Sequence, residues 1–266
     1  YVVKIERCLS ESFNGYSSGT GTEKANVINQ MFADQEVKAI WCVRGGDTSS
    51  HAMDKIDYKM IRNNPKIFVG YSDITNLHVS LNQICNLITF HGPMVESNML
   101  ERYDAFTKES FENTLNMGDE LSLKNPPGEN FQVLVEGHAE GTIIGGNLSL
   151  LVSMIGTPYE VHTEGKILFI EDVDEEIRRL DRMMYQLKYS GKLDYVAGII
   201  FGDFTNCVNR KKRSYTIIHM LQDFLSDFKN PVLYNIKSGH CFPMSTIPLG
   251  MQCIMDTTTR EIRFKK

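Results

Sequence analysis

The segment KIFVGYSDITNLHVSL, residues 66–81, decides the fold class that this sequence predicts. Its apolar run ends at Gly70 and gives way, within a few residues, to a helical pattern from Ile74 to Ile84. A buried strand that turns at once into a helix is typical of a parallel sheet covered by helices. The segment therefore predicts an α/β fold, and Ser72 lies at the tip of the turn.

The same alternation of strand and helix patterns continues on both sides of this segment. A predicted helix at 23–32, a strand at 37–43 and a helix at 52–62 precede it, and another helix at 107–117 follows. We therefore predict an N-terminal α/β domain over residues 1–115, with a parallel sheet of the Rossmann or flavodoxin-like type that carries the nucleophile.

A break in this pattern predicts a second domain. Residues 116–132 contain LSLKNPPGEN, whose two prolines and glycine are the strongest turn signal in the chain, so we predict a linker there. Residues 133–266 mix strand and helix patterns, and 247–266 resemble two strands around a threonine-rich turn. The second half therefore predicts a β-rich α+β domain.

The overall charge argues against two classes of partner. With 28 basic and 33 acidic residues, the 266-residue chain has a formal net charge of −5 and no excess positive potential for nucleic acid or a membrane surface. The basic run 210–213 is interpreted as a solvated loop. No stretch approaches the roughly 18 apolar residues of a membrane span, and no signal segment is recognised, so we expect a cytoplasmic protein.

The cysteines predict neither disulfides nor a metal site. Six cysteines stand far apart, without a C-x-x-C pair, and most of them are interpreted as small buried hydrophobic residues. We expect the protein to use no metal and no cofactor.

Ser72 has two interpretations. In the first, Gly70 permits a tight turn that lifts the Ser72 hydroxyl into the crevice at the carboxyl end of the sheet, where it acts as a nucleophile. The N–H of Asp73 would then stabilise the oxyanion that forms on the attacked carbonyl. In the second, Ser72 or Asp73 only caps the helix that begins at Ile74. The segment lacks the second glycine of G-x-S-x-G, so it does not decide between them.

A serine nucleophile needs a histidine base and a carboxylate that orients it. Five of the seven histidines fall in helical or polar stretches and are interpreted as surface or ordinarily hydrogen-bonded groups. Two candidates stay open: His91, after a predicted strand, and His240, in a loop beside Gly239. For the carboxylate, Glu171 and Asp172 end the predicted strand in GKILFIEDVDEE. Their alternative role, beginning the next helix, suits the three acids after them better.

The stretch CVRGGDTSS, residues 42–50, adds a possible second oxyanion donor. A predicted strand ends there in Arg44, Gly45 and Gly46, whose exposed peptide N–H groups can bind a developing negative charge. As a phosphate site the stretch fails, because no Lys-Ser or Lys-Thr follows the glycines.

Taken together and in order, these stretches resemble the LD-carboxypeptidases, a serine peptidase family that also contains the microcin C self-immunity proteins. The resemblance covers about residues 19–250 and keeps the family's order and spacing. It rests on the segments AIWCVRGG, IDYKMIRNNPKIFVGYSDITNLH, TFHGPM, EGTIIGGNLSLLVSMIGTPYE, GKILFIEDVDEE with LDRMMYQL, GIIFGDF, and GHCFPMSTIPLG.

The resemblance implies a catalytic triad. Its serine lies in the GYSD turn, hence Ser72; its glutamate ends the ILFIED strand, hence Glu171; and its histidine is in the GH loop, hence His240. His91 then becomes a neighbouring residue that is either structural or supports the triad from behind, and Asp172 becomes a flanking acid.

The same resemblance implies an oxyanion hole made by the backbone N–H groups of Asp73 and of the Gly-Gly loop, most of all Gly46. It places the active site at the junction of the two domains. The sequence departs from the family at residues 47–49, which read Asp-Thr-Ser where many members have Tyr-Gly. The family's first strand is also not found before Tyr1, and if the molecule lacks it we expect an unpaired sheet edge.

The implied function is that of a serine LD-carboxypeptidase in peptidoglycan recycling, a hydrolase that releases the terminal D-alanine from a murein tetrapeptide or a related small peptide. The family likeness also suggests a homodimer. We expect Arg44 to bind the free carboxylate of the substrate, because a guanidinium matches a planar carboxylate; its alternative role is a structural ion pair.

Three alternatives stay open. A microcin C-type self-immunity amidase that cleaves an aminoacyl nucleotide would use the same triad, but Trp41 lies in a predicted strand and the connection 156–166 is short, which favours the murein branch. An acyl esterase is disfavoured by the missing G-x-S-x-G. A non-enzymatic module would bind a muropeptide without needing Ser72.

Overall fold

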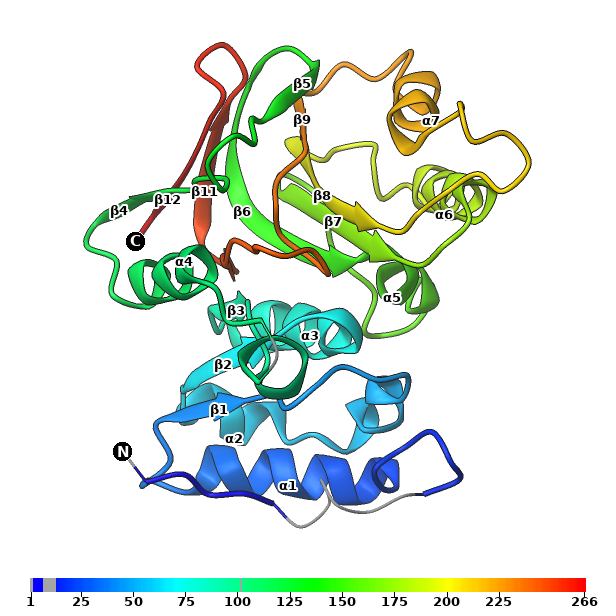
Figure 1. Cartoon of the computed structure of the whole chain (residues 1–266). Helices are drawn as coiled ribbons and strands as arrows, with labels where there is room; N and C mark the ends of the chain where they lie inside the picture. The colour runs from blue at the N-terminus through cyan, green and yellow to red at the C-terminus, as the bar shows by residue number, and fades with distance from the viewer. Residues whose placement is uncertain (1, 7–12, 101) are drawn as a thin grey trace.

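The chain folds around two sheets, which are stacked one above the other in Figure 1. The structure is a computed structural model of the whole chain, and it describes residues 2–6, 13–100 and 102–266. Strands and helices alternate along most of the described chain, so the predicted mixed α/β class is confirmed.

The smaller sheet consists of β1 (Ala39–Trp41), β2 (Ile67–Gly70), β3 (Thr89–His91) and β10 (Ile247–Leu249), in that order within the described chain. The first three strands are parallel, as the alternating pattern predicted. β10 comes from the far end of the sequence and pairs antiparallel with β3, with Ile247 opposite His91. β1 forms one edge of this sheet.

Three helices of the N-terminal half form where helical periodicity predicted them. They are α1 (Gly21–Ala33), α3 (Thr75–Cys85) and α4 (Ala105–Leu115). α1 begins with a capping box, in which Thr20 and Glu23 bond each other's backbone N–H groups. α3 contacts both α2, described next, and β3, and it continues directly from the turn that contains Ser72.

The single helix predicted over 52–62 is wrong. One 3-10 turn, Ser49–His51, ends just before this range; a second, Met53–Lys55, occupies its first half, and only α2 (Tyr58–Asn63) is α-helical. Asp57 explains the break, because its side chain accepts the N–H of Met60 at 2.9 Å and so begins a new helix.

The larger sheet consists of β4 (Glu120–Ser122), β5 (Gln132–Val135), β6 (His138–Asn147), β7 (Ile167–Val173), β8 (Gly198–Thr205), β9 (Val232–Tyr234), β11 (Gln252–Asp256) and β12 (Glu261–Lys265). Within the described residues its order is β4-β12-β11-β6-β7-β8-β9-β5. The central strands β6 to β9 are parallel, and the outer pairs are antiparallel. This mixture agrees with the predicted α+β character.

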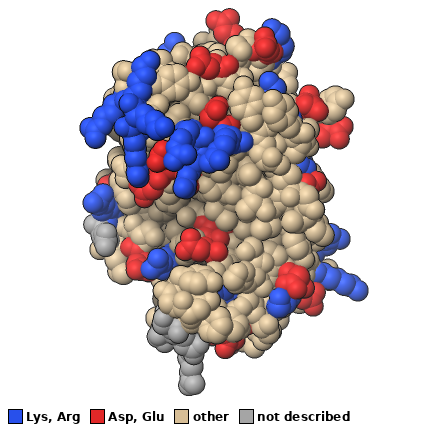
Figure 2. Space-filling model, turned by 90° about the vertical axis from the view of Figure 1, so that its right-hand side faces the viewer, with Lys and Arg blue, Asp and Glu red and all other residues tan. Residues whose placement is uncertain are grey.

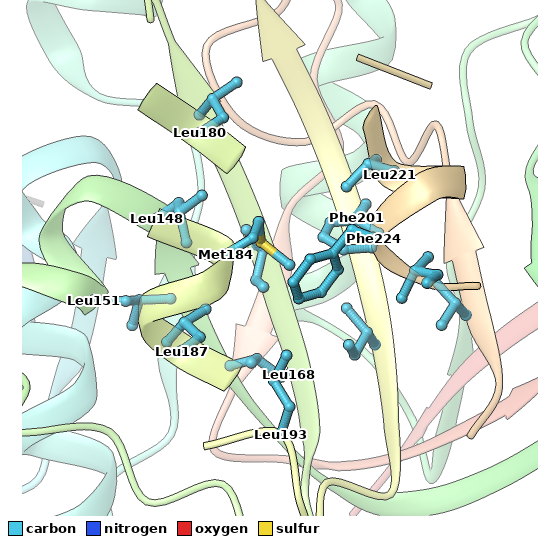
Figure 3. Close-up of a cluster of buried hydrophobic side chains, with 14 of the residues drawn as sticks. Leu148, Leu151, Leu168, Leu180, Met184, Leu187, Leu193, Phe201, Leu221 and Phe224 are labelled. Atoms are coloured by element: carbon cyan, nitrogen blue, oxygen red, sulfur yellow. The ribbon is translucent and has the colours of Figure 1, made fainter. Parts of the chain in front are cut away.

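One face of the larger sheet is covered by α5 (Leu148–Ser153), α6 (Ile177–Tyr189) and α7 (Ile217–Phe224), on the right of Figure 1. Their buried side chains meet those of β7 and β8 in a continuous apolar core (Figure 3). This core fixes β7, whose last residues include Glu171, against the helices. Its labelled members are Leu148, Leu151, Leu168, Leu180, Met184, Leu187, Leu193, Phe201, Leu221 and Phe224.

The two predicted domains share strands. β4 lies inside the 116–132 segment predicted as a linker, yet it pairs with β12. β10, from the C-terminal half, completes the smaller sheet. The division into two domains stays a prediction, and these strands tie the two halves of the chain together.

The right-hand side of Figure 1 faces the viewer in Figure 2, which shows Lys and Arg side chains gathered on one part of that face. Glu176, at the start of α6, pairs with Arg178 at 2.6 Å and with Arg210 at 3.8 Å, and residues 210–213 are exposed, as predicted for a solvated loop.

Two further sequence expectations concern the interior of the protein. Within the described residues, no helix has the length and apolar character that a membrane span requires. The five cysteines that the structure describes are free thiols, and four of them are buried. Cys8 lies outside the described residues.

Candidate active site

The turn after β2 holds Ser72 in an unusual backbone conformation. Gly70 ends the strand, and a Cβ there would lie 3.0 Å from two side-chain carbons of Ile74 and 3.1 Å from Cys42 Cβ. Ser72 has a φ of 65°, in the left-handed region that non-glycine residues rarely occupy. Strain of this kind is typical of a functional turn that presents one side chain in a fixed direction.

The structure contradicts the capping interpretation of this turn. The first helical residues after β2 form a 3-10 turn, Ser72–Ile74, and α3 follows it. The N-cap residues of the 3-10 turn and of α3 are Tyr71 and Ile74, and neither makes a side-chain capping hydrogen bond. Neither Ser72 nor Asp73 therefore serves as a cap.

The Asp73 carboxylate, which the sequence analysis used only for its backbone N–H, anchors the loop after β1. Asp73 is buried, and its Oδ2 accepts the N–H groups of Thr48 at 3.0 Å and of Ser49 at 2.9 Å. Its Oδ1 accepts the Ser49 hydroxyl at 2.7 Å, and Asn76 donates to the same hydroxyl at 3.0 Å. The departure from the family's pattern at Asp47-Thr48-Ser49 thus supplies two partners of Asp73.

The Gly-Gly loop lies directly against Ser72. A Cβ on Gly45 would lie 2.9 Å from Ser72 Cβ and 3.0 Å from Ser72 Oγ, so only glycine permits this approach. Within the described chain, the N–H groups of Gly46 and Asp73 have no hydrogen-bond partner. The turn and the loop therefore offer two free backbone donors beside the Ser72 hydroxyl.

A histidine and a glutamate from the C-terminal half form a buried pair. His240 Nδ1 lies 2.8 Å from Glu171 Oε2, and the two side chains are 16% and 0% exposed. Two glycines make room for the carboxylate: a Cβ on Gly239 would lie 2.7 Å from Glu171 Oε2, and one on Gly202 would lie 3.0 Å from Glu171 Cβ. The geometry requires Nδ1 to carry the shared proton when Glu171 is ionised, which leaves Nε2 as the free acceptor.

Charges around this pair favour a protonated imidazole. Burial lowers the pKa of His240, but the charge and the hydrogen bond of Glu171, together with the charges of Asp172 and Asp174, outweigh burial and raise the pKa above the ordinary value of 6.5. A histidine poised in this way can take up a proton from a hydroxyl and return it to a leaving group near neutral pH.

Asp172, the alternative carboxylate, has a structural position. Its oxygens accept the N–H and the hydroxyl of Ser149, at 3.0 and 2.8 Å, and the amide of Asn147, at 3.1 Å. Burial and the neighbouring Glu171 raise the pKa of Asp172 to about 6. Asp172 therefore joins the end of β7 to the start of α5 and faces away from the histidine pair.

His91, the alternative base, is buried behind the pair. Its ring packs edge-on against Phe169 at 5.1 Å, and Tyr71 lies between it and His240, with ring centroids at 5.8 and 4.9 Å. Burial, and the charges of His78 and His240, hold the pKa of His91 well below the ordinary value. His91 therefore stays neutral and does not open onto the cavity.

A cavity of about 310 Å³ is lined by five of the seven predicted site residues; Asp73 and Glu171 do not line it. Ser72 and His240 both line it, although no hydrogen bond joins their side chains among the described residues. Arg44 also lines it and is mostly exposed, 3.9 Å from Glu96. A larger cavity of about 570 Å³, near Arg62 and Cys85, contains none of the predicted site residues. The cavity lining is Arg44, Gly45, Gly46, Tyr71, Ser72, Met94, Glu96, Ser97 and His240.

Comparisons with known proteins match both halves of the chain to one family. Residues 1–92 match the LD-carboxypeptidase N-terminal domain, and residues 140–255 match the LD-carboxypeptidase C-terminal domain. The fold and these matches define the class of protein, which is that of the carboxypeptidases. Within this class, the chain belongs to the LD-carboxypeptidase family.

Individual relatives agree with this assignment. The chain is similar to the probable murein peptide carboxypeptidase of Bacillus subtilis, with 42% identity over 97% of this chain and 81% of that protein. It is 30% identical to the microcin C7 self-immunity protein MccF of Escherichia coli, over 93% of this chain and 79% of that protein. The crystal structure of muramoyltetrapeptide carboxypeptidase from Oxalobacter formigenes superimposes with a TM-score of 0.85 at 27% identity, covering 97% of this chain and 88% of that one.

Proposed function

We propose that this protein is a serine LD-carboxypeptidase that releases the terminal D-alanine from murein tetrapeptides, with Ser72, His240 and Glu171 as its catalytic triad. The observation that carries the proposal is the 2.8 Å bond between His240 and the buried Glu171, beside a cavity that His240 shares with the strained Ser72. The 42% identity to a probable murein peptide carboxypeptidase supports the choice of substrate.

The first half of the reaction forms an acyl-enzyme. Ser72 Oγ attacks the carbonyl carbon of the last peptide bond while His240 Nε2 takes the hydroxyl proton. Glu171 orients the ring and stabilises the imidazolium that results. The C–N bond then breaks as His240 gives this proton to the amine of the leaving D-alanine.

The second half restores the enzyme. Water attacks the ester on Ser72 while His240 accepts a proton from the water. The ester C–O bond then breaks as His240 gives this proton to the Ser72 oxygen. In both halves, the negative charge on the carbonyl oxygen is bound by the free N–H groups of Asp73 and Gly46. None of these steps requires a metal or a cofactor.

Substrate recognition is assigned to Arg44. A carboxypeptidase must bind the free carboxylate beyond the scissile bond, and Arg44 lines the same cavity as Ser72. Its contact with Glu96 is long and largely exposed, so the guanidinium can exchange this partner for a substrate carboxylate at little cost.

A microcin C-type amidase is the second candidate, favoured by the 30% identity to MccF. The higher identity to the murein peptide carboxypeptidase argues for the first candidate. Trp41, the single tryptophan, lies in β1, where its Nε1 donates to the carbonyl of Pro93 at 2.6 Å and its ring packs on Phe111. It is therefore not free to stack on a nucleotide.

The test is mass-spectrometric detection of D-alanine released from a murein tetrapeptide by wild type, by Ser72→Ala and by chelator-treated wild type. We expect release by wild type with or without chelator, and none by Ser72→Ala. Release by Ser72→Ala, or its loss with chelator, would reject the mechanism. Offering an aminoacyl sulfamoyl nucleotide to the same samples separates the two candidate substrates. A place in peptidoglycan recycling, a cytoplasmic location and a homodimer stay predictions.

A further inference from the structure

Unpaired polar atoms collect behind the His240–Glu171 pair. Seven buried side-chain atoms have no hydrogen-bond partner in the described part of the chain. Five of the seven belong to four fully buried residues near this pair: both ring nitrogens of His91, Glu171 Oε1, Ser238 Oγ and Thr246 Oγ1. A buried polar group without a partner costs about 1–3 kcal/mol, so such a concentration calls for a ligand that satisfies it.

Packing places His91, Glu171 and Ser238 around one side chain, Phe169. The His91 ring meets Phe169 at 5.1 Å, and Glu171 follows Phe169 by two residues on β7, on the same face of the strand. A Cβ on Gly202 would lie within 3.0 Å of the Ser238 carbonyl oxygen, of Phe169 Cε2 and of Glu171 Cβ. These residues therefore lie close together, in one small region around Phe169.

Two more contacts close this region. Tyr71 covers it on the side of the catalytic turn, because its ring touches those of both His91 and His240. Thr246 lies next to Gly92, where a Cβ would be 3.1 Å from Thr246 Oγ1. Tyr71, which also lines the cavity, therefore lies between the cavity and these donors and acceptors.

We propose that an internal water molecule binds in this region and bridges His91 to Glu171 Oε1, which makes His91 a positioning residue for the catalytic carboxylate. A buried water needs two to four polar partners, and His91, Glu171 and Ser238 supply them. The inference rests on the catalytic role proposed for Glu171, and it assigns His91 a function beyond packing.

The chemistry of the bridge follows from the neutral state of His91. A neutral imidazole donates from one nitrogen and accepts at the other. The water accepts the His91 N–H and donates one proton to Glu171 Oε1, so the carboxylate is bonded at both oxygens: Oε2 by His240 and Oε1 by the water. A carboxylate held in this way is less basic, and its attraction for the imidazolium is moderated.

The test must separate this effect from others on the same pair. The titratable and charged groups that act on the pair, or that line the cavity beside it, come from several elements packed around it. They are Tyr71, His91, Asp172, Asp174, Cys207, Cys241 and, in the cavity, Arg44 and Glu96. Of these groups the variants below change only His91; the other two substitutions, at Ser238 and at the control position Ser80, change hydroxyl groups without altering any charge.

The first measurement is the pH dependence of kcat/KM for wild type, His91→Phe and Ser238→Ala, with Ser80→Ala as the matched control. Ser80 is also a buried hydroxyl without a partner, but it lies on α3 away from the pair. Losing the bridge leaves Glu171 more basic, which raises the pKa of His240 further. We therefore expect His91→Phe to move the acidic limb of the kcat/KM profile to higher pH by roughly half a unit, and Ser238→Ala to move it less. Ser80→Ala leaves the limb in place.

The second measurement is a high-resolution crystal structure of the wild type, which does not depend on any variant folding. Density for a water within hydrogen-bond distance of His91 and Glu171 Oε1 supports the proposal. If this density is missing, the proposal is overturned. It is also overturned if His91→Phe is folded and active and the acidic limb of its kcat/KM profile stays where it is in the wild type. Activity retained by Ser72→Ala would instead reject the proposed function, and the crystal structure would still decide on the water.

Discussion

The strained serine and the acid that follows it explain how two distant loops are held in one arrangement. Ser72 can keep a φ of 65° because the next residue, Asp73, is fixed by three hydrogen bonds to the loop after β1. That loop carries Gly46, whose N–H is a proposed oxyanion donor. One carboxylate therefore sets the distance between the nucleophile and half of its oxyanion hole.

Replacing this carboxylate should reduce catalysis more than it reduces stability. In Asp73→Asn the amide oxygen can replace only one carboxylate oxygen, so its NH2 faces either the two backbone N–H groups or the Ser49 hydroxyl, which already accepts from Asn76; the anchoring bonds weaken and the loop shifts. We expect kcat/KM to fall about 10²-fold, the size of effect seen when an oxyanion donor is misplaced. Ser49→Ala removes the hydroxyl's bonds with Asp73 and Asn76 but keeps both backbone N–H bonds to Asp73, so it should cost only about fivefold. Steady-state kinetics measure both, and equal activity of Asp73→Asn and wild type would contradict the anchoring role.

The carboxylate of the pair sets the pH range of activity. Glu171 raises the pKa of His240, and the enzyme needs neutral His240 as its base, so the acidic limb of the kcat/KM profile of the wild type lies above pH 6.5. In Glu171→Gln we expect this limb to move to lower pH while kcat falls about 10²- to 10⁴-fold. A limb that stays in place in Glu171→Gln would show that another group is the base.

The same pair affects stability in a pH-dependent way. The pKa of His240 is higher in the folded state than the unfolded value of 6.5, so its contribution is fully present below pH 6.5 and is lost as the pH rises through the raised folded pKa. Glu171→Gln should therefore lower the melting temperature more at pH 6 than at pH 9, relative to wild type. Thermal unfolding at both pH values checks this, and the opposite order would contradict the assigned sign.

Among the secondary-structure elements, the loop after β9 and the end of β7 depend on each other through a glycine. Gly239 has a φ of 131°, and a Cβ there would lie 2.7 Å from Glu171 Oε2. We expect Gly239→Ala to separate His240 from Glu171 and to reduce kcat at least tenfold. Gly191 is the matched control, because it also has a positive φ, 77°, but ends α6 far from the site. Both variants should lose stability, and only Gly239→Ala should lose activity; equal losses of activity would argue against the predicted contact.

Most elements could be predicted because their signals are local. Periodicity located β2, α3 and β7, and the order of motifs, through the family likeness, pointed to Ser72, Glu171 and His240. The break before α2 was missed because Asp57 caps a new helix inside an apparently continuous pattern. The anchoring role of Asp73 was missed for a different reason: its partners lie 24 and 25 residues away, and sequence spacing gives no sign of them.

The pairing of β10 with β3 could not be predicted from the sequence either, because a three-residue apolar strand does not indicate which of two sheets it will join. It matters for the whole molecule. β10 belongs to the chain segment that carries His240, and β3 pairs with β2, which leads into Ser72. The sheet that presents the nucleophile is therefore completed by the segment that presents the base.

Weakening β10 should destabilise the molecule and impair catalysis together. Leu249 is fully buried, so Leu249→Ala should cost about 2–4 kcal/mol of unfolding free energy and leave an apolar cavity. Leu100, which is 75% exposed, is the matched control, and Leu100→Ala should change stability by no more than about 0.5 kcal/mol. Urea denaturation measures both. If Leu249→Ala were as stable as the wild type, β10 would contribute little to holding the two halves of the chain together.

The central claim is that the Ser72 hydroxyl becomes covalently bonded to the substrate. Mass spectrometry of the protein, quenched in acid soon after mixing with a murein tetrapeptide and then digested, tests this claim most directly. The account predicts a peptide containing Ser72 whose mass is increased by the tripeptide acyl group, present in wild type and missing in Ser72→Ala. D-alanine release with the adduct on another residue would contradict it.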